Sequence, residues 1–214
     1  MRQALREPDV KPSINRNLAG MLVKQGRMRE AEPFAKISYD ADKKDLKAAQ
    51  IYLNCLLDLG KSDKAFEVCT LALKDHPDDK LINVSQASSL RSQMKNDQAL
   101  IKIDELLERF SDEPVVRRIK ADILGDSDSS SAIPHYQEAL DLSVKQKGTP
   151  DPAIMWNMSL HLLRCRKLEQ GWECWEQGFH PVVGTMGRNL PKRINDMERA
   201  DAEGKEIDKS KWTI

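Results

Sequence analysis

Residues 46–79 contain two short amphipathic helical patterns joined by a turn, and they restrict the fold more than any other stretch of the sequence. Apolar residues recur at i, i+3, i+4 and i+7, which places them on one face of each helix. The first face comprises Ala49, Tyr52, Leu53 and Leu56, and the second comprises Ala65, Val68, Cys69, Ala72 and Leu73. Gly60 lies in the turn, and Pro77 follows the second helix. Because the alanines add only a methyl group, the two helix axes can approach closely, and we expect a helical hairpin.

The same arrangement recurs along residues 12–179. Its units lie near 12–45, 46–79, 80–113, 114–148 and 152–179. The order aromatic or Leu, small residue, turn Gly, Ala, aromatic, Ala and Pro over 34 residues resembles the tetratricopeptide repeat (TPR), although Leu53 and Cys69 depart from it. The resemblance implies an all-α fold, a right-handed α-α superhelix (TPR solenoid) of about five helical hairpins.

Two of the turns differ from the glycine turn of the reference unit. In the third unit we expect Lys95-Asn96-Asp97 to replace the glycine, because Asn and Asp tolerate a left-handed backbone and can cap the next helix. In the fourth unit the stretch Gly125–Ser131 is predicted to be a polar linker, whose serines cap the following helix. Asp126-Ser127-Asp128 imitates a metal-binding carboxylate pair, but a solvated turn is the simpler interpretation, since turn acids usually cap helices.

The ends of the chain differ from the repeats in composition. Residues 1–11 are polar and are predicted to form an N-terminal arm. Residues 180–214 are predicted to contain a helix from Pro191 to near Gly204, followed by a tail. Such a helix could cap the open end of the stack, because terminal repeats need a cap.

Composition excludes several function classes. The 214 residues include 34 Lys plus Arg and 34 Asp plus Glu, so no net field indicates nucleic acid as a partner. No apolar run approaches the roughly 20 residues that span a bilayer, and the start lacks the apolar core of a secretory signal. The four cysteines lie on helical faces without CxxC spacing. They predict buried thiols in a reducing compartment, hence a cytoplasmic protein.

No residue pattern predicts a reaction centre, so we assign no catalytic, cofactor-binding or metal-binding residues. The four histidines are scattered through different segments, and no two have metal-ligand spacing. His161 and Cys165 are four residues apart and could meet on one helical face, but no third orienting group or oxyanion donor accompanies them. The chain is therefore predicted not to be an enzyme, unless it is a fragment of a larger one.

Recognition of a partner is the remaining function. In the TPR resemblance the first helices of successive hairpins line a concave surface, through repeat positions 2, 5, 9, 12 and 13. Read onto this sequence, the candidate groove residues are Arg16, Lys24, Lys47, Gln50, Asn54, Arg91, Arg118, Trp156 and Arg164. Cations outnumber anions among these positions, so a slightly basic groove is predicted to bind a protein or peptide with acidic side chains.

Two other functions stay open. The string from Asn157 through Glu176 resembles the last repeat before the catalytic part of bacterial TPR-containing glycosyltransferases. That resemblance implies a non-catalytic front end that positions a protein acceptor, and it is tested by whether the native reading frame continues beyond Ile214. The second alternative is self-assembly through the repeat ends or the tryptophan-rich fifth unit.

Overall fold

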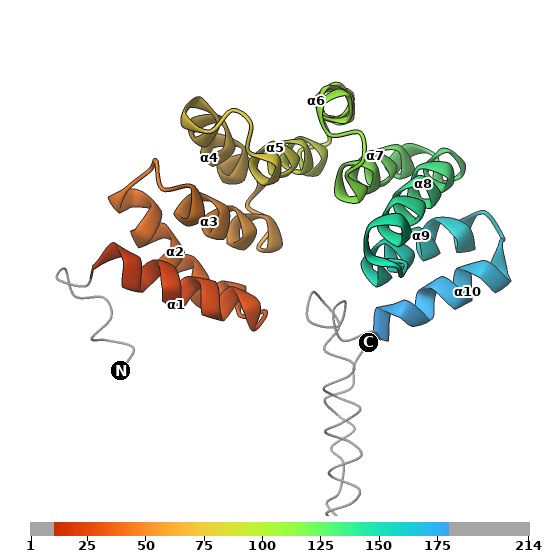
Figure 1. Cartoon of the computed structure of the whole chain (residues 1–214), viewed down its shortest axis with the longest axis horizontal. Coiled ribbons are helices and arrows are strands. Elements are labelled where there is room, and N and C mark those ends of the chain that lie inside the picture. Colours follow the sequence, from red (N-terminus) through yellow and green to blue (C-terminus); the bar gives the residue numbers. More distant parts are fainter. Residues whose placement is uncertain (1–10, 180–214) are drawn as a thin grey trace, which may run out of the picture.

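The computed structural model describes residues 11–179, and within that range it is entirely helical. The helices are α1 (Pro12–Lys24), α2 (Met28–Ala41), α3 (Leu46–Asp58), α4 (Ser62–Asp75), α5 (Lys80–Ser92), α6 (Asn96–Arg109), α7 (Pro114–Ser127), α8 (Ser129–Lys147), α9 (Pro152–Arg164) and α10 (Leu168–Glu176), followed by the 3₁₀ turn η2 (Gln177–Phe179). They pair into consecutive antiparallel hairpins that curve into an arch (Figure 1). This arrangement confirms the predicted all-α solenoid.

Sequence features place the starts of the first helices. Pro12, Pro114 and Pro152 open α1, α7 and α9 at a position where the missing N–H is not needed. Asp45 and Asp79 cap α3 and α5 by accepting hydrogen bonds from backbone amides of the first turn. Each carboxylate satisfies an otherwise unpaired donor and lies at the positive end of the helix dipole.

Small residues hold the two helices of each hairpin together. The fourth residue of the second helix is an alanine in each of the first four hairpins, and it is completely buried (Ala31, Ala65, Ala99 and Ala132). Gly171 takes the same place in α10, and a Cβ added there would lie 2.6 Å from Cδ2 of Leu163. Side chains larger than alanine would push the paired helices apart. The repeating small residue therefore fixes the hairpin geometry, as the sequence predicts.

The first helices line the inner side of the arch. Successive first helices contact one another, α1 with α3, α3 with α5, α5 with α7 and α7 with α9. In Figure 1 α4 and α6 lie toward the outside of the arch, beyond α3 and α5. Each hairpin packs only on its neighbours, and the buried apolar residues form a series of clusters along the stack rather than one central core.

In most hairpins the turn between the two helices contains one residue with a left-handed backbone conformation (positive φ). Gly26 and Gly60 have φ of 70° and 69°, as a glycine turn requires. In the third hairpin the equivalent residue is Met94, with φ of 61°, and not a residue of the expected turn Lys95-Asn96-Asp97. Asn96 and Asp97 instead start α6. Arg166 takes the left-handed position in the fifth hairpin, with φ of 59°.

Replacing Met94 with glycine is expected to stabilise the protein by about 0.5–1 kcal/mol. A left-handed backbone costs a residue with a Cβ roughly 1–2 kcal/mol, whereas the greater flexibility of glycine in the unfolded chain offsets part of that gain. The Met94 side chain is 82% exposed, so the substitution loses little packing. Urea denaturation followed by circular dichroism measures the change, with Gly60→Ala expected to shift stability in the opposite direction. An unaltered midpoint for Met94→Gly would contradict this account of the turn.

The fourth hairpin departs from the predicted linker. Gly125, Asp126 and Ser127 belong to α7, and only Asp128 separates α7 from α8. The Asp128 carboxylate caps α8 by accepting from the amides of Ser130 and Ser131. The serines were expected to cap this helix, but the aspartate does so, because its two oxygens can serve both amides. The pKa of Asp128 is lowered mainly by the Ser130 hydroxyl and amide.

The predicted arm (1–11) and capping helix (191–204) lie outside the described residues, apart from Lys11. Among the helices that the structure describes, none is both long and apolar enough to cross a membrane.

Candidate functional site

The predicted groove residues all lie on first helices. They divide by exposure into two groups. Lys24, Lys47, Asn54 and Arg164 are exposed, whereas Arg16, Gln50, Arg91, Arg118 and Trp156 are half-buried. The half-buried group has partners within the protein, and those partners decide what each side chain can offer to a ligand.

Arg16 and Gln50 tie one hairpin to the next. Arg16 forms an ion pair with Asp45, and Gln50 Nε2 donates to Asp79 Oδ2 at 3.0 Å. Both acceptors are the N-cap residues of the following first helix. Burial raises the pKa of Asp45, but the Ala48 amide and Arg16 outweigh it, so the pKa lies below its usual value. These two groove positions are therefore links between repeats.

Arg91 and Arg118 belong to a polar cluster at the junction of the third, fourth and fifth hairpins. Arg91 forms a two-pronged ion pair with Asp126, with both N–O distances at 2.7 Å. Arg118 Nη1 lies 2.6 Å from Asp122 Oδ2, and the Tyr136 hydroxyl donates to the other Asp122 oxygen. The Asp122 side chain is only 7% exposed, so these partners take the place of the water it has lost.

Asp126 was expected in a solvated turn, but it lies in α7 and pairs with Arg91. Within residues 11–179 no group of three histidine, cysteine or acidic side chains is arranged to hold a metal ion. The two acids of the motif serve separate structural purposes, an ion pair for Asp126 and a helix cap for Asp128.

His161 closes this cluster from the fifth hairpin. Its ring packs on Tyr136 with centroids 5.4 Å apart, and Nδ1 lies 3.1 Å from Ser129 Oγ. Burial lowers the pKa of His161, and the nearby Arg164 lowers it further. The ring occupies the space over Gly125, where an added Cβ would be 2.2 Å from His161 Cε1.

His161 and Cys165, four residues apart in the sequence, do not interact through their side chains. His161 Nδ1 faces Ser129, and the hydrogen bond between His161 and Cys165 joins main-chain atoms. Cys55, Cys69 and Cys174 are buried free thiols, as expected, and Cys165 is half-buried. Burial raises the pKa of both Cys55 and Cys69 to about 12, so neither is a thiolate at neutral pH.

The Trp156 side chain packs against other aromatic side chains of the fifth hairpin. Its ring lies 4.5 Å from that of Trp175, which also meets Trp172 edge-on at 6.0 Å. A Cβ on Gly178 would come within 2.6 Å of Trp156 Cε3. This contact explains why Gly178 stands where the repeat pattern has alanine: the larger ring of Trp156 takes the space of the missing methyl group.

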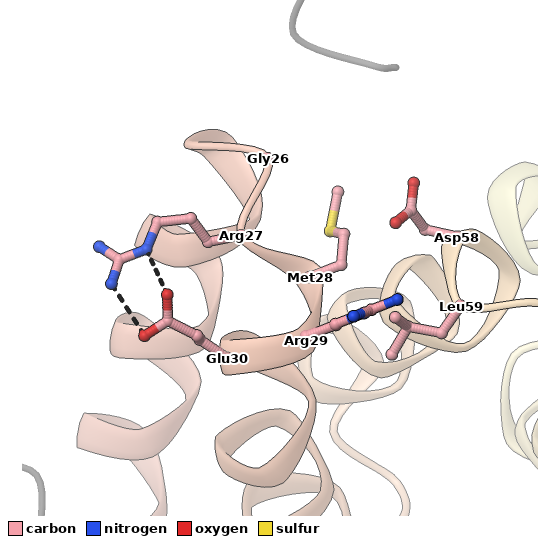
Figure 2. Close-up of a pocket in the computed structure, with 7 residues that line it drawn as sticks. All are labelled: Gly26, Arg27, Met28, Arg29, Glu30, Asp58 and Leu59. Atoms are coloured by element: carbon pink, nitrogen blue, oxygen red, sulfur yellow. Dashed lines mark hydrogen bonds and ion pairs between the residues drawn. The ribbon is translucent and has the colours of Figure 1, made fainter. Parts of the chain in front are cut away.

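A hollow lies at the turn edge between the first and second hairpins (Figure 2). Figure 2 shows Met28 and Arg29 extending toward Asp58 and Leu59, while Arg27 is paired with Glu30 at 2.8 and 2.9 Å. A second hollow occurs at the next junction. Its lining residues are Gly60, Ser62, Asp63, Ser92, Gln93 and Lys95, most of them one 34-residue repeat beyond residues of the first hollow.

The chemistry of the two hollows differs although their positions agree. Arg29 in the first corresponds to Asp63 in the second, and Met28 corresponds to Ser62. The hollow recurs at successive junctions because the hairpins stack in the same way. Since its charges differ from one junction to the next, the hollow does not indicate a specific ligand. The inner face of the first helices therefore stays the better candidate site.

Sequence reasoning missed the acids that pair with the groove cations. One signal was present: Asp45 and Asp79 stand at the last position of consecutive repeats, and Arg16 and Gln50 stand at the fifth. Residues one repeat apart become neighbours when hairpins stack. The repeat register could thus have predicted these contacts, but the Arg91–Asp126 pair also required knowing that α7 continues through Ser127.

No protein-family model matches the sequence, and no curated protein is similar to it. Solved structures are similar in fold. TTC0263, a thermophilic TPR protein in Thermus thermophilus, is 14% identical with a TM-score of 0.68, over 86% of this chain and 96% of that one. MamA (41-end) from Desulfovibrio magneticus RS-1 is 16% identical with a TM-score of 0.54, over 83% and 97%. YrrB, a TPR protein with an unusual peptide-binding site, is 13% identical with a TM-score of 0.50, over 86% and 94%. The chain therefore has the fold of TPR proteins.

Proposed function

We propose that this chain is a binding scaffold that holds an extended acidic segment of a partner protein along the inner face of its first helices. The observation that carries this proposal is that the groove positions include both exposed apolar side chains and exposed cationic side chains. Leu81 on α5 and Leu160 on α9 are large, apolar and exposed. Lys47 occupies the position of Leu81 one hairpin earlier, and Arg164 lies one helical turn beyond Leu160.

The charge of this face is smaller than a count of its residues suggests. Arg16, Arg91 and Arg118 are each paired with an aspartate. The exposed cations that remain at the groove positions are Lys24, Lys47 and Arg164, against the exposed Asp58. These three carry the attraction for an acidic ligand, whereas Arg16 and Arg91 link neighbouring hairpins and Arg118 pairs with Asp122 within α7.

Similar proteins give this proposal limited support. YrrB, a similar fold, is described as having a peptide-binding site. That description concerns YrrB, and it supports only the idea that a stack of such hairpins can hold a peptide. Extended peptides laid in a groove gain affinity from apolar side chains and specificity from charge complementarity.

A fluorescence-anisotropy titration tests the proposal with two labelled peptides, one alternating Glu with Leu and the other alternating Lys with Leu. We expect only the acidic peptide to bind, and its affinity to fall as salt is raised, because exposed charges are screened. The double variant Lys47→Glu/Arg164→Glu should weaken binding at least tenfold. The matched control is Lys74→Glu/Lys145→Glu, which makes the same charge change on exposed positions of second helices α4 and α8. Equal loss in both variants, or equal binding of both peptides, would contradict the proposed groove.

The glycosyltransferase-associated role stays a sequence prediction. Its motif includes Trp172 and Trp175, and Trp175 packs on Trp156 within the fifth hairpin. This packing gives part of the string a structural reason. Reading the native gene past Ile214 for a pattern of alternating strands and helices tests the hypothesis directly.

A further inference from the structure

Helix α1 exposes apolar side chains at positions that the later first helices bury. Ile14 is 47% exposed and Met21 is 60% exposed, at repeat positions 3 and 10. The equivalent residues are Ala48 and Cys55, Ile82 and Ser89, Val116 and Ile123, and Ile154 and His161, none more than 8% exposed. Ile82, for example, belongs to the apolar cluster of the two hairpins before it. Ile14, Met21 and Lys24 together define the α1 face, which is the side that would receive a preceding hairpin.

The other end of the stack has a corresponding surface. Leu168 is 57% exposed and Trp172 is 55% exposed on α10. Phe66 stands at the position of Trp172 in the second hairpin, and there it packs against the apolar cluster of the following hairpins. Leu168, Trp172 and the three glutamates of α10 together define the α10 face, which is the side that would receive a following hairpin.

The two faces are complementary in charge. Helix α1 contains Arg16 and Lys24 and no acidic residue, and Lys24 is exposed. Helix α10 contains Glu169, Glu173 and Glu176, all exposed, and no basic residue. Contact of the faces would bring apolar side chains together, with opposite charges beside them.

We propose that a second copy of this chain docks its α10 face on the α1 face, so that chains associate head to tail. The contact would continue the stacking that already joins neighbouring hairpins, with Trp172 and Leu168 covering Ile14 and Met21. Such an interface joins different surfaces of the two copies, so each bound copy still presents one open end and the association can propagate. Apart from Lys24, which belongs to both, this surface is distinct from the inner face proposed for ligand binding.

Light scattering coupled to size-exclusion chromatography tests this on the full chain. The wild type is expected to show a molar mass that rises with concentration and falls at high salt. Met21→Asp and Trp172→Asp each remove one face and should each be monomeric. Mixed together they should form a dimer and nothing larger, because the intact α10 face of the first variant can dock on the intact α1 face of the second.

The control is Ile101→Asp, which places a charge on an equally exposed apolar residue of α6 (63% exposed) and should assemble as the wild type does. Circular dichroism shows whether each variant remains folded. A wild type that is monomeric at every concentration overturns the proposal, and shows that the chain's own remaining residues or another partner cover these faces. Dimers in either single variant, or no dimer in the mixture, also overturn it.

Discussion

Replacing Gly125 with alanine is expected to lower the free energy of unfolding by about 2 kcal/mol. The added Cβ would lie 2.2 Å from Cε1 of the buried His161 ring. The ring cannot move freely, because it packs on Tyr136 and its Nδ1 forms a hydrogen bond with the Ser129 hydroxyl. Overpacking of this kind costs typically 1–3 kcal/mol, and losing the hydrogen bond adds about 1 kcal/mol. Alanine recovers about 1 kcal/mol of helix propensity within α7, which leaves a net loss.

The effect of Gly125→Ala on the free energy of unfolding should change sign when the His161 side chain is removed. In a His161→Ala background the space over Gly125 is empty, so Gly125→Ala should stabilise the protein by about 1 kcal/mol through helix propensity alone. Urea denaturation of the four proteins of this double-mutant cycle measures the coupling. If Gly125→Ala has the same effect in both backgrounds, then the histidine is not what requires the glycine.

Replacing Arg118 with methionine is expected to destabilise the protein by about 2–4 kcal/mol. Methionine keeps most of the apolar stem but leaves the buried Asp122 carboxylate without its ion-pair partner. Removing one member of a buried pair is costly because the remaining charge stays desolvated. The Tyr136 hydroxyl still donates to Asp122, so the loss should lie at or below the usual range for such a pair. Chemical denaturation monitored by circular dichroism measures it.

The adjacent Arg117 provides a matched control. It lies on the same helix and pairs with Glu138, whose side chain is 47% exposed. Arg117→Met should therefore cost less than about 1 kcal/mol, as exposed ion pairs usually do. A second comparison, Arg118→Met combined with Asp122→Asn, should recover part of the loss because the buried charge is gone. Equal effects of Arg117→Met and Arg118→Met would show that burial of Asp122 does not determine the stability of this junction.

These two predictions bear on how the inner face works. Of the arginines that give it a basic appearance in the sequence, Arg91 joins the third hairpin to the fourth through Asp126, and Arg118 pairs with the buried Asp122 on its own helix α7. Changing Arg91 or Arg118 would therefore confuse loss of binding with loss of structure. Binding is therefore best tested by substituting exposed cations such as Lys47 and Arg164, because these changes affect charge without breaking an ion pair among the described residues.

The pattern of the sequence was sufficient for the order and the pairing of the helices, but not for every turn between them. Helix faces depend on residues three and four positions apart, and a recurring alanine such as Ala65 dictates where two helices cross. The turn of the fourth hairpin was predicted wrongly because Gly125 suggests a break when read locally. It lies inside α7, where its missing side chain leaves space for the ring of His161, 36 residues later.

The amino-acid sequence alone therefore determined the class of fold, because it follows from the size and polarity of residues at short, regular intervals. The resemblance to the tetratricopeptide repeat implied which helices carry the inner face. Tertiary structure decided which cations on that face pair with an aspartate and which have no ion-pair partner within residues 11–179. It also decided that Ile14 and Trp172 are left uncovered in the described part of the chain. The physical reason is that ion pairing and burial depend on residues about one repeat apart, which become neighbours only when the hairpins stack.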